Sequence, residues 1–136
     1  PASAGGIGII DATGNRAVMA PKWSFNAAII HELPLEGGML NTRLDYNYLD
    51  EFYTGENGEV NSKDYLNPSR GLVNASISYI TTDDRWTITL WGKNLADEVS
   101  PVNRRYHHSA GQSSVKEHFI QPRSTNVSVS YRFGGR

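Results

Sequence analysis

The feature that most constrains the fold is a strict alternation of apolar and polar residues near the C-terminal end. Every second residue from Val127 to Phe133 is apolar, and the residues between them are Ser128, Ser130 and Arg132. Successive side chains of a β-strand point to opposite sides, so this period predicts a strand with two unlike faces. On a helix the same residues would be distributed around the axis and would bury no common face.

The same period recurs along the sequence. We expect strands over residues 22–32, 39–53, 71–82, 86–95 and 122–133. Short turns follow the first and third of these strands, and long polar loops follow the second and fourth. The loops cover residues 54–69 and 97–121. All short turns then lie at one end of the strands and all long loops at the other. The prediction is an all-β, antiparallel up-and-down meander of about five strands.

Two details of this pattern carry separate expectations. Residues 1–21 are rich in Gly, Ala and Pro and are interpreted as a loop or truncated start, and residues 134–136 as a short tail. Trp91 falls among the polar positions of its strand, and the neighbouring Gly92 suggests a β-bulge that re-aims it.

Composition excludes several classes of protein. With no Cys, the chain has neither a disulfide scaffold nor a Cys-ligated zinc or iron–sulfur site. A net charge of −1 gives no argument for nucleic-acid binding. No apolar run is long enough for a membrane helix, and mean hydropathy is −0.48. Such averages do not reveal transmembrane strands, because half of their residues face water.

The placement of aromatic residues helps to decide whether lipid or a protein interior surrounds the apolar faces. Near the short-turn end we expect Tyr79, Trp86, Tyr131 and Phe133, and near the long-loop end Trp23, Tyr46 and Tyr48. Two aromatic rings around a band of aliphatic residues are typical of transmembrane barrels, whose strands need roughly 9–11 residues to cross the bilayer. A soluble β-sandwich or lipocalin-like barrel also alternates, and it would bury these aromatics inside.

Two segments together carry a resemblance to a known family. Trp91-Gly-Lys-Asn-Leu-Ala-Asp-Glu98 and Pro122-Arg-Ser-Thr-Asn-Val-Ser-Val-Ser-Tyr-Arg-Phe133 resemble the C-terminal end of TonB-dependent outer-membrane receptors. In that family the penultimate strand commonly ends in Lys/Arg-Asn-Leu-x-Asp-Glu, and the last strand opens with Pro-Arg and ends in Tyr-x-Phe. The segment that begins at Asn67 is similar to the family's third-last strand. The resemblance covers roughly residues 20–133.

The resemblance implies a 22-stranded transmembrane barrel filled by a plug domain, which imports iron–siderophores, haem, cobalamin or glycans with energy passed through TonB. We therefore expect residues 22–133 to be the C-terminal barrel strands of a non-enzymatic receptor in the bacterial outer membrane. The implied partners are outer-membrane lipid, the plug domain and remaining barrel strands, the TonB system, and a small molecule such as a ferric siderophore. No cofactor or metal is expected. The family usually ends at the aromatic residue, whereas Gly134-Gly-Arg136 follows Phe133 here.

A physical argument also favours a fragment. A five-stranded sheet with a lipid face has two unpaired edges, and each unmet backbone group in hydrocarbon costs several kcal/mol. Two other possibilities remain open at this point. Several copies could associate, or the isolated sheet could lie in water with its apolar face covered.

Two groups of residues are candidates for function. Arg104, Arg105, Tyr106, His107 and His108 lie in the second long loop, where cations and aromatics suit an anionic ligand. Solvated loop side chains are the simpler interpretation, and adjacent histidines, even with His118, do not suggest a metal site. The second group, on the polar faces of its strands and therefore expected to face the lumen, is Arg43, Asp45, Lys93 and Arg132.

Three function classes follow from these observations. The first is the C-terminal segment of an active importer of an iron–siderophore or a similar scarce nutrient. The second is a soluble antiparallel β domain that binds a carbohydrate or a small apolar ligand. The third is a smaller outer-membrane channel without a plug.

Overall fold

The computed structural model describes residues 13–54, 63–109 and 112–134, with backbone alone at residues 63, 105–109 and 112–113. The main sheet is antiparallel and has the order β1-β2-β5-β6-β9. Its strands are β1 (Ser24–Leu35), β2 (Gly38–Leu49), β5 (Arg70–Thr81), β6 (Trp86–Lys93) and β9 (Ser124–Tyr131). Each of these five strands lies beside the next one along the chain, so the predicted meander is confirmed.

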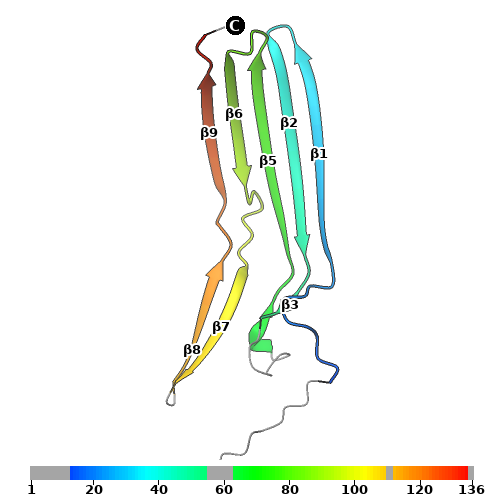
Figure 1. Cartoon of the computed structure of the whole chain (residues 1–136), viewed down its shortest axis with the longest axis vertical. Coiled ribbons are helices and arrows are strands. Elements are labelled where there is room, and N and C mark those ends of the chain that lie inside the picture. The colour runs from blue at the N-terminus through cyan, green and yellow to red at the C-terminus, as the bar shows by residue number, and fades with distance from the viewer. Residues whose placement is uncertain (1–12, 55–62, 110–111, 135–136) are drawn as a thin grey trace, which may run out of the picture.

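The remaining elements lie together at one end of this sheet (Figure 1). They are the paired strands β3 (Phe52–Tyr53) and β4 (Leu66–Asn67), the 3₁₀ turn η1 (Lys63–Tyr65), and the hairpin of β7 (Pro101–Ser109) and β8 (Gln112–Phe119). The β1–β2 and β5–β6 turns lie at the opposite end, as does the end of β9. The predicted separation of short turns from long loops is therefore confirmed.

The largest differences from the sequence expectation lie at three places. β1 continues through Pro34 to Leu35, which leaves a two-residue turn at Glu36 and Gly37. A proline is tolerated there because β1 is an edge strand of this sheet. β2 ends at Leu49 rather than at Tyr53. The second long loop contains the β7–β8 hairpin, which its weakly alternating sequence did not predict.

The strand register gives the main sheet one apolar and one polar face. Residues directly opposite each other in an antiparallel pair share a face. One row runs Leu44, Ala75, Gly92 and Thr125, and a neighbouring row pairs Ile77 with Leu90 and Leu90 with Val127. We call this side the apolar face. The residues of the other side are mainly Asn, Ser and Thr, with Arg43, Asp45 and Lys93, and we call it the polar face.

The apolar face is open. Ile77, Ile88 and Val127 are 46%, 45% and 66% exposed, respectively. Among the described residues no second layer covers them, and in Figure 1 no other element overlaps the five strands. The soluble-domain interpretation required these side chains to be buried inside a compact body. The observed exposure argues against that interpretation.

The expected β-bulge at Gly92 is wrong. The register of β6 is continuous on both sides, with Gly92 opposite Ala75 and Thr125, and Trp91 opposite Ser76 and Asn126. Trp91 therefore stays on the polar face. A larger residue would not fit at position 92, because a Cβ placed there would lie 2.6 Å from Cδ2 of Leu95. The glycine leaves room for Leu95 to fold back against the sheet.

Aromatic side chains gather at both ends of the apolar face. At the long-loop end the ring of Phe25 lies 5.3 Å from that of Tyr48 and 5.7 Å from that of Tyr46, measured between centroids. At the short-turn end Tyr131 lies 4.6 Å from both Trp86 and Phe133. The two aromatic groups flank an aliphatic band, which is the pattern of a membrane-spanning barrel wall.

The described part of the chain contains no helix of the length and apolar character that a bilayer-crossing helix requires.

Candidate functional site

The buried part of the described structure lies at the long-loop end, where β3, β4, η1 and the β7–β8 hairpin meet. We call this region the loop junction. Phe52 and Tyr65 are its buried aromatic residues, at 6% and 8% exposure. The polar residues Asn67, Asn94 and Ser100 are also buried. Buried polar groups are costly without partners, so the hydrogen bonds of this region decide its shape.

Thr54 connects three segments of the loop junction. Its backbone N–H donates to the Tyr65 carbonyl at 2.9 Å. Its hydroxyl lies 3.3 Å from the Tyr65 carbonyl oxygen and 3.1 Å from that of Arg104. The same hydroxyl accepts a hydrogen bond from Nδ2 of Asn67 at 3.1 Å. The first long loop is thereby fixed against the β7 strand that carries the predicted ligand contacts.

Arg104 is held in place from two sides. Its guanidinium Nε lies 2.7 Å from Oε1 of Glu117 on the neighbouring strand, and its Nη1 donates to the Leu66 carbonyl at 3.1 Å. The side chains of this ion pair are 30% and 29% exposed. An anionic ligand could therefore reach Arg104 only in competition with Glu117. Arg70 makes a similar hydrogen bond between β5 and β7, because its Nη1 donates to the Pro101 carbonyl at 3.1 Å.

The other four candidate contacts are placed by their backbone. Arg105, Tyr106, His107 and His108 follow Arg104 in β7 and lie opposite Lys116, Val115, Ser114 and Ser113 of β8, respectively. Their side chains lie outside the described part of the structure. Their role as ligand contacts thus stays a prediction. Among the described side chains, no group of three His, Cys, Asp or Glu residues could hold a metal ion.

Three of the four lumen candidates lie on the polar face. Arg43 forms a bidentate pair with Asp45, with nitrogen–oxygen distances of 2.6 to 2.9 Å. The ammonium of Lys93 lies 5.1 Å from the ring centroid of Trp91 on the same strand. Arg132 follows the end of β9, and its N–H donates to the Arg85 carbonyl at 2.9 Å. That these residues face a lumen stays a prediction.

Asn94 is the residue that the sequence interpretation missed. It has a positive φ of 50°, and asparagine is one of the few residues that enter this region readily. Its Nδ2 lies 2.8 Å from the Glu98 carbonyl and 3.1 Å from the Gln121 carbonyl, and its Oδ1 accepts from the Glu98 N–H at 2.9 Å. Its own N–H donates to Oδ1 of Asn74 at 3.0 Å. One side chain thus shapes the turn after β6 and holds the segment that leads into β9.

A second contact joins the same two segments. Nη2 of Arg123 lies 3.6 Å from Oδ2 of Asp97, and the Arg123 N–H donates to Oδ1 of Asp97 at 3.4 Å. Asn94 and Asp97 belong to one of the two sequence motifs noted above, and Arg123 belongs to the other. The opposite charges of Asp97 and Arg123, one in each motif, could have indicated this contact.

One family model matches the chain. Residues 3–95 match the model described as TonB dependent receptor-like, beta-barrel. This is more than half of the 136 residues. Among curated proteins and solved structures, nothing matches the chain.

Proposed function

The chain belongs to the TonB-dependent receptor-like β-barrel family, which is located in the bacterial outer membrane, and on this premise we propose its specific role. The members of this family are receptors and transporters rather than enzymes, and they interact with a ligand and with TonB. The chain provides the C-terminal strands of a larger barrel that imports a ferric siderophore or a similarly scarce nutrient. The energy comes through TonB, and the plug domain closes the lumen.

The observation that carries this proposal is the contrast between the two faces of one sheet. Aliphatic side chains flanked by aromatics are exposed on the apolar face, as lipid contact requires. The polar face carries the Arg43–Asp45 pair. Within the described residues, β1 and β9 each pair on one side only. Open strand edges are not stable in hydrocarbon, so further strands of a barrel are expected on both sides.

The ligand contacts belong to the β7–β8 hairpin. Arg104, Arg105, Tyr106, His107 and His108 bring positive charge and aromatic rings to the end of the sheet that carries the long loops. Guanidinium groups bind carboxylate and other anionic oxygens through paired hydrogen bonds, and aromatic rings stack on planar groups. The network around Thr54 and Arg104 supports this role, since it fixes β7 against the first long loop.

The test measures binding of radio-iron to the full-length receptor, with catecholate and hydroxamate siderophores as separate probes. We expect the double variant Arg105→Gln/Tyr106→Ala to weaken binding of the recognised class by about tenfold or more, because a charge-assisted hydrogen bond contributes about 1.5–3 kcal/mol. Lys116→Gln, on the facing strand, is the matched control. Unchanged binding in the double variant would refute the assigned contacts.

The import role itself is tested separately. A strain that lacks the receptor should lose TonB-dependent uptake of the recognised class and regain it when the full-length gene is restored. If uptake does not depend on the receptor for any probe, the proposed import role fails. If the purified full-length protein is monodisperse without detergent, the membrane placement fails as well, and the soluble-domain interpretation takes its place.

A further inference from the structure

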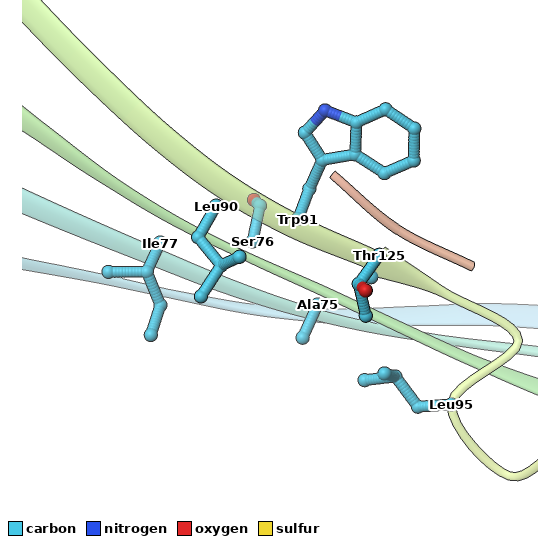
Figure 2. A pocket seen from close by; sticks show the side chains of 8 residues that line it. Ala75, Ser76, Ile77, Leu90, Trp91, Leu95 and Thr125 are labelled. Atoms are coloured by element: carbon cyan, nitrogen blue, oxygen red, sulfur yellow. The ribbon is translucent and has the colours of Figure 1, made fainter. Parts of the chain in front are cut away.

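The apolar face carries a hollow near its long-loop end. It has a volume of about 160 Å³. Figure 2 shows Ile77, Leu90, Leu95 and Thr125 on one side of the sheet, whereas Trp91 extends to the other side. The exposed lining is almost entirely apolar. Pockets for drug-sized ligands measure roughly 300–1,000 Å³, so this hollow is too small for an imported nutrient.

The hollow exists because small residues replace large ones at this height of the sheet. Gly92 lies opposite Ala75 on one side and Thr125 on the other. Leu95 forms one wall, and its backbone N–H donates to the Val73 carbonyl at 2.8 Å, which fixes its position. The floor is therefore the backbone of the sheet, and the walls are aliphatic side chains.

The hollow lies beside one of the two aromatic groups of the apolar face. At the long-loop end, β1 and β2 carry Phe25, Tyr46 and Tyr48 on the apolar face. The ring of Tyr46 also covers Gly71 of β5, since a Cβ there would lie 2.5 Å from its hydroxyl. Gly92 and Thr125 lie in the row of Leu44, which follows the row of Tyr46 toward the middle of the apolar face. A lipid chain can approach the sheet more closely at this place than beside the aromatic side chains.

A cationic residue lies close in sequence to the hollow. Arg123 precedes the lining residue Thr125 by two positions, and its side chain is 56% exposed. Its separation of 3.6 Å from Asp97 is long for a direct hydrogen bond, and Asp97 is itself 51% exposed. Exposed pairs of this kind contribute little, so an anion can compete for the guanidinium.

We propose that the hollow holds one acyl chain of an anionic lipid whose phosphate contacts Arg123. The aliphatic walls match a hydrocarbon chain, and the exposed cation matches the charge of the headgroup. The site lies on the lipid-facing side of the wall. It depends on the outer-membrane location and is independent of which nutrient the receptor imports.

The test uses fluorescence quenching in the full-length receptor. This chain has no cysteine, so Thr125→Cys gives one labelling site in it for a small fluorophore. Any cysteine elsewhere in the receptor is replaced by serine. The probes are vesicles containing phosphatidylglycerol or phosphatidylcholine with brominated chains, which quench at contact. We expect phosphatidylglycerol to bind about fivefold more tightly than phosphatidylcholine beside the label, the size expected for one cation and an anionic lipid.

Three variants make the result specific. Arg123→Gln should reduce the preference for phosphatidylglycerol to about one, because it removes the charge and keeps a polar side chain. Ala75→Leu should lower quenching by both lipids, because it fills the hollow, whereas Ala27→Leu on β1 is the matched control on the same face. A label at Val129→Cys, away from the hollow, should show no preference.

Several outcomes would overturn the proposal. Equal binding of the two lipids at position 125 would refute the headgroup contact, and unchanged quenching in Ala75→Leu would refute the acyl-chain site. Sedimentation of the receptor as a dimer that Ala75→Leu dissociates would assign the hollow to a second copy. None of these outcomes affects siderophore uptake, so failure here is distinguishable from failure of the import role.

Discussion

The main sheet and the loop junction are stabilised by opposite means. In the sheet, large apolar side chains such as Ile29 and Val127 are 68% and 66% exposed. In the loop junction, Asn67 and Ser100 are 0% and 1% exposed. The sheet has no protein layer over its apolar face in the described residues, so the bilayer must supply the apolar surroundings. The loop junction buries side chains of its own, and Nδ2 of the buried Asn67 donates to the Thr54 hydroxyl there.

The comparison indicates which kind of substitution destabilises each region. A charge placed on the apolar face of the sheet meets hydrocarbon and has no partner there. A lost hydrogen bond in the loop junction leaves a buried polar group without water or partner.

The first prediction concerns the two faces of β5. Ile77→Arg should lower the free energy of unfolding of the full-length receptor in lipid vesicles by about 2–4 kcal/mol, because the charge enters the bilayer. The neighbouring Ser78→Arg places the same charge on the polar face. It should lose only about 1 kcal/mol, from the hydrogen bond of 2.9 Å between the Ser78 and Thr89 hydroxyls. Denaturant titration of tryptophan fluorescence measures both values, and equal losses would mean that the faces are assigned wrongly.

The second prediction concerns Asn94 of the loop junction. Asn94→Ala should destabilise the receptor by about 2–3 kcal/mol, because the Glu98 and Gln121 backbone groups lose their partner. Asn94→Gly loses the same side-chain bonds but accepts the positive φ of 50° without strain. It should therefore be less destabilised than the alanine variant by about 1 kcal/mol. The same titration checks this, and a neutral alanine variant would contradict the role of Asn94.

The third prediction concerns the partly exposed ion pair of the β7–β8 hairpin. Glu117→Gln should lower stability by at most about 1 kcal/mol, since partly solvated pairs contribute little. Hydrogen exchange of the hairpin amides should accelerate, while that of β5 stays unchanged. Lys116→Gln is the control on the same strand. Faster exchange throughout the main sheet would show that the two regions are not independent.

The fourth and smallest prediction concerns pH at the β5–β6 turn. A hydrogen bond from the Thr81 hydroxyl, joined by one from the Arg85 N–H, lowers the pKa of Asp83 below 3.8. Because the folded-state pKa is the lower one, this stabilisation is present above pH 3.8 and is lost as the pH falls through the folded-state pKa. Wild type should therefore unfold at a higher temperature than Asp83→Asn at neutral pH, with the difference disappearing in acid. A difference that persists in acid would exclude the carboxylate as its source.

The main sheet could be predicted from sequence because its information is local. Alternation along 127–133 assigns each residue to a face, and the register between strands confirms the assignment. The exceptions are also local in origin. Gly92 resembled a bulge, but the space that it leaves is used by Leu95, three residues later. Sequence periodicity does not distinguish a glycine at a β-bulge from a glycine that leaves space for a neighbouring side chain.

The loop junction could not be predicted in the same way because its contacts are distant in sequence. Thr54 contacts the carbonyl of Arg104, and Asn94 contacts that of Gln121. Neither pair belongs to a periodic pattern. The predicted ligand residues were found from their chemical type alone. Their side chains from Arg105 to His108 lie outside the described structure, so their role remains a prediction.

The central claim is that lipid covers the apolar face, and nitroxide scanning of β9 tests it most directly. Single cysteines at Thr125 through Tyr131 of the full-length receptor carry the spin label in vesicles. The account predicts that labels at Val127 and Val129 collide mainly with oxygen dissolved in lipid. Labels at Ser128 and Ser130 should be shielded from it, which gives a two-residue period. Equal oxygen accessibility along the whole strand, or maxima at the serines, would contradict the account.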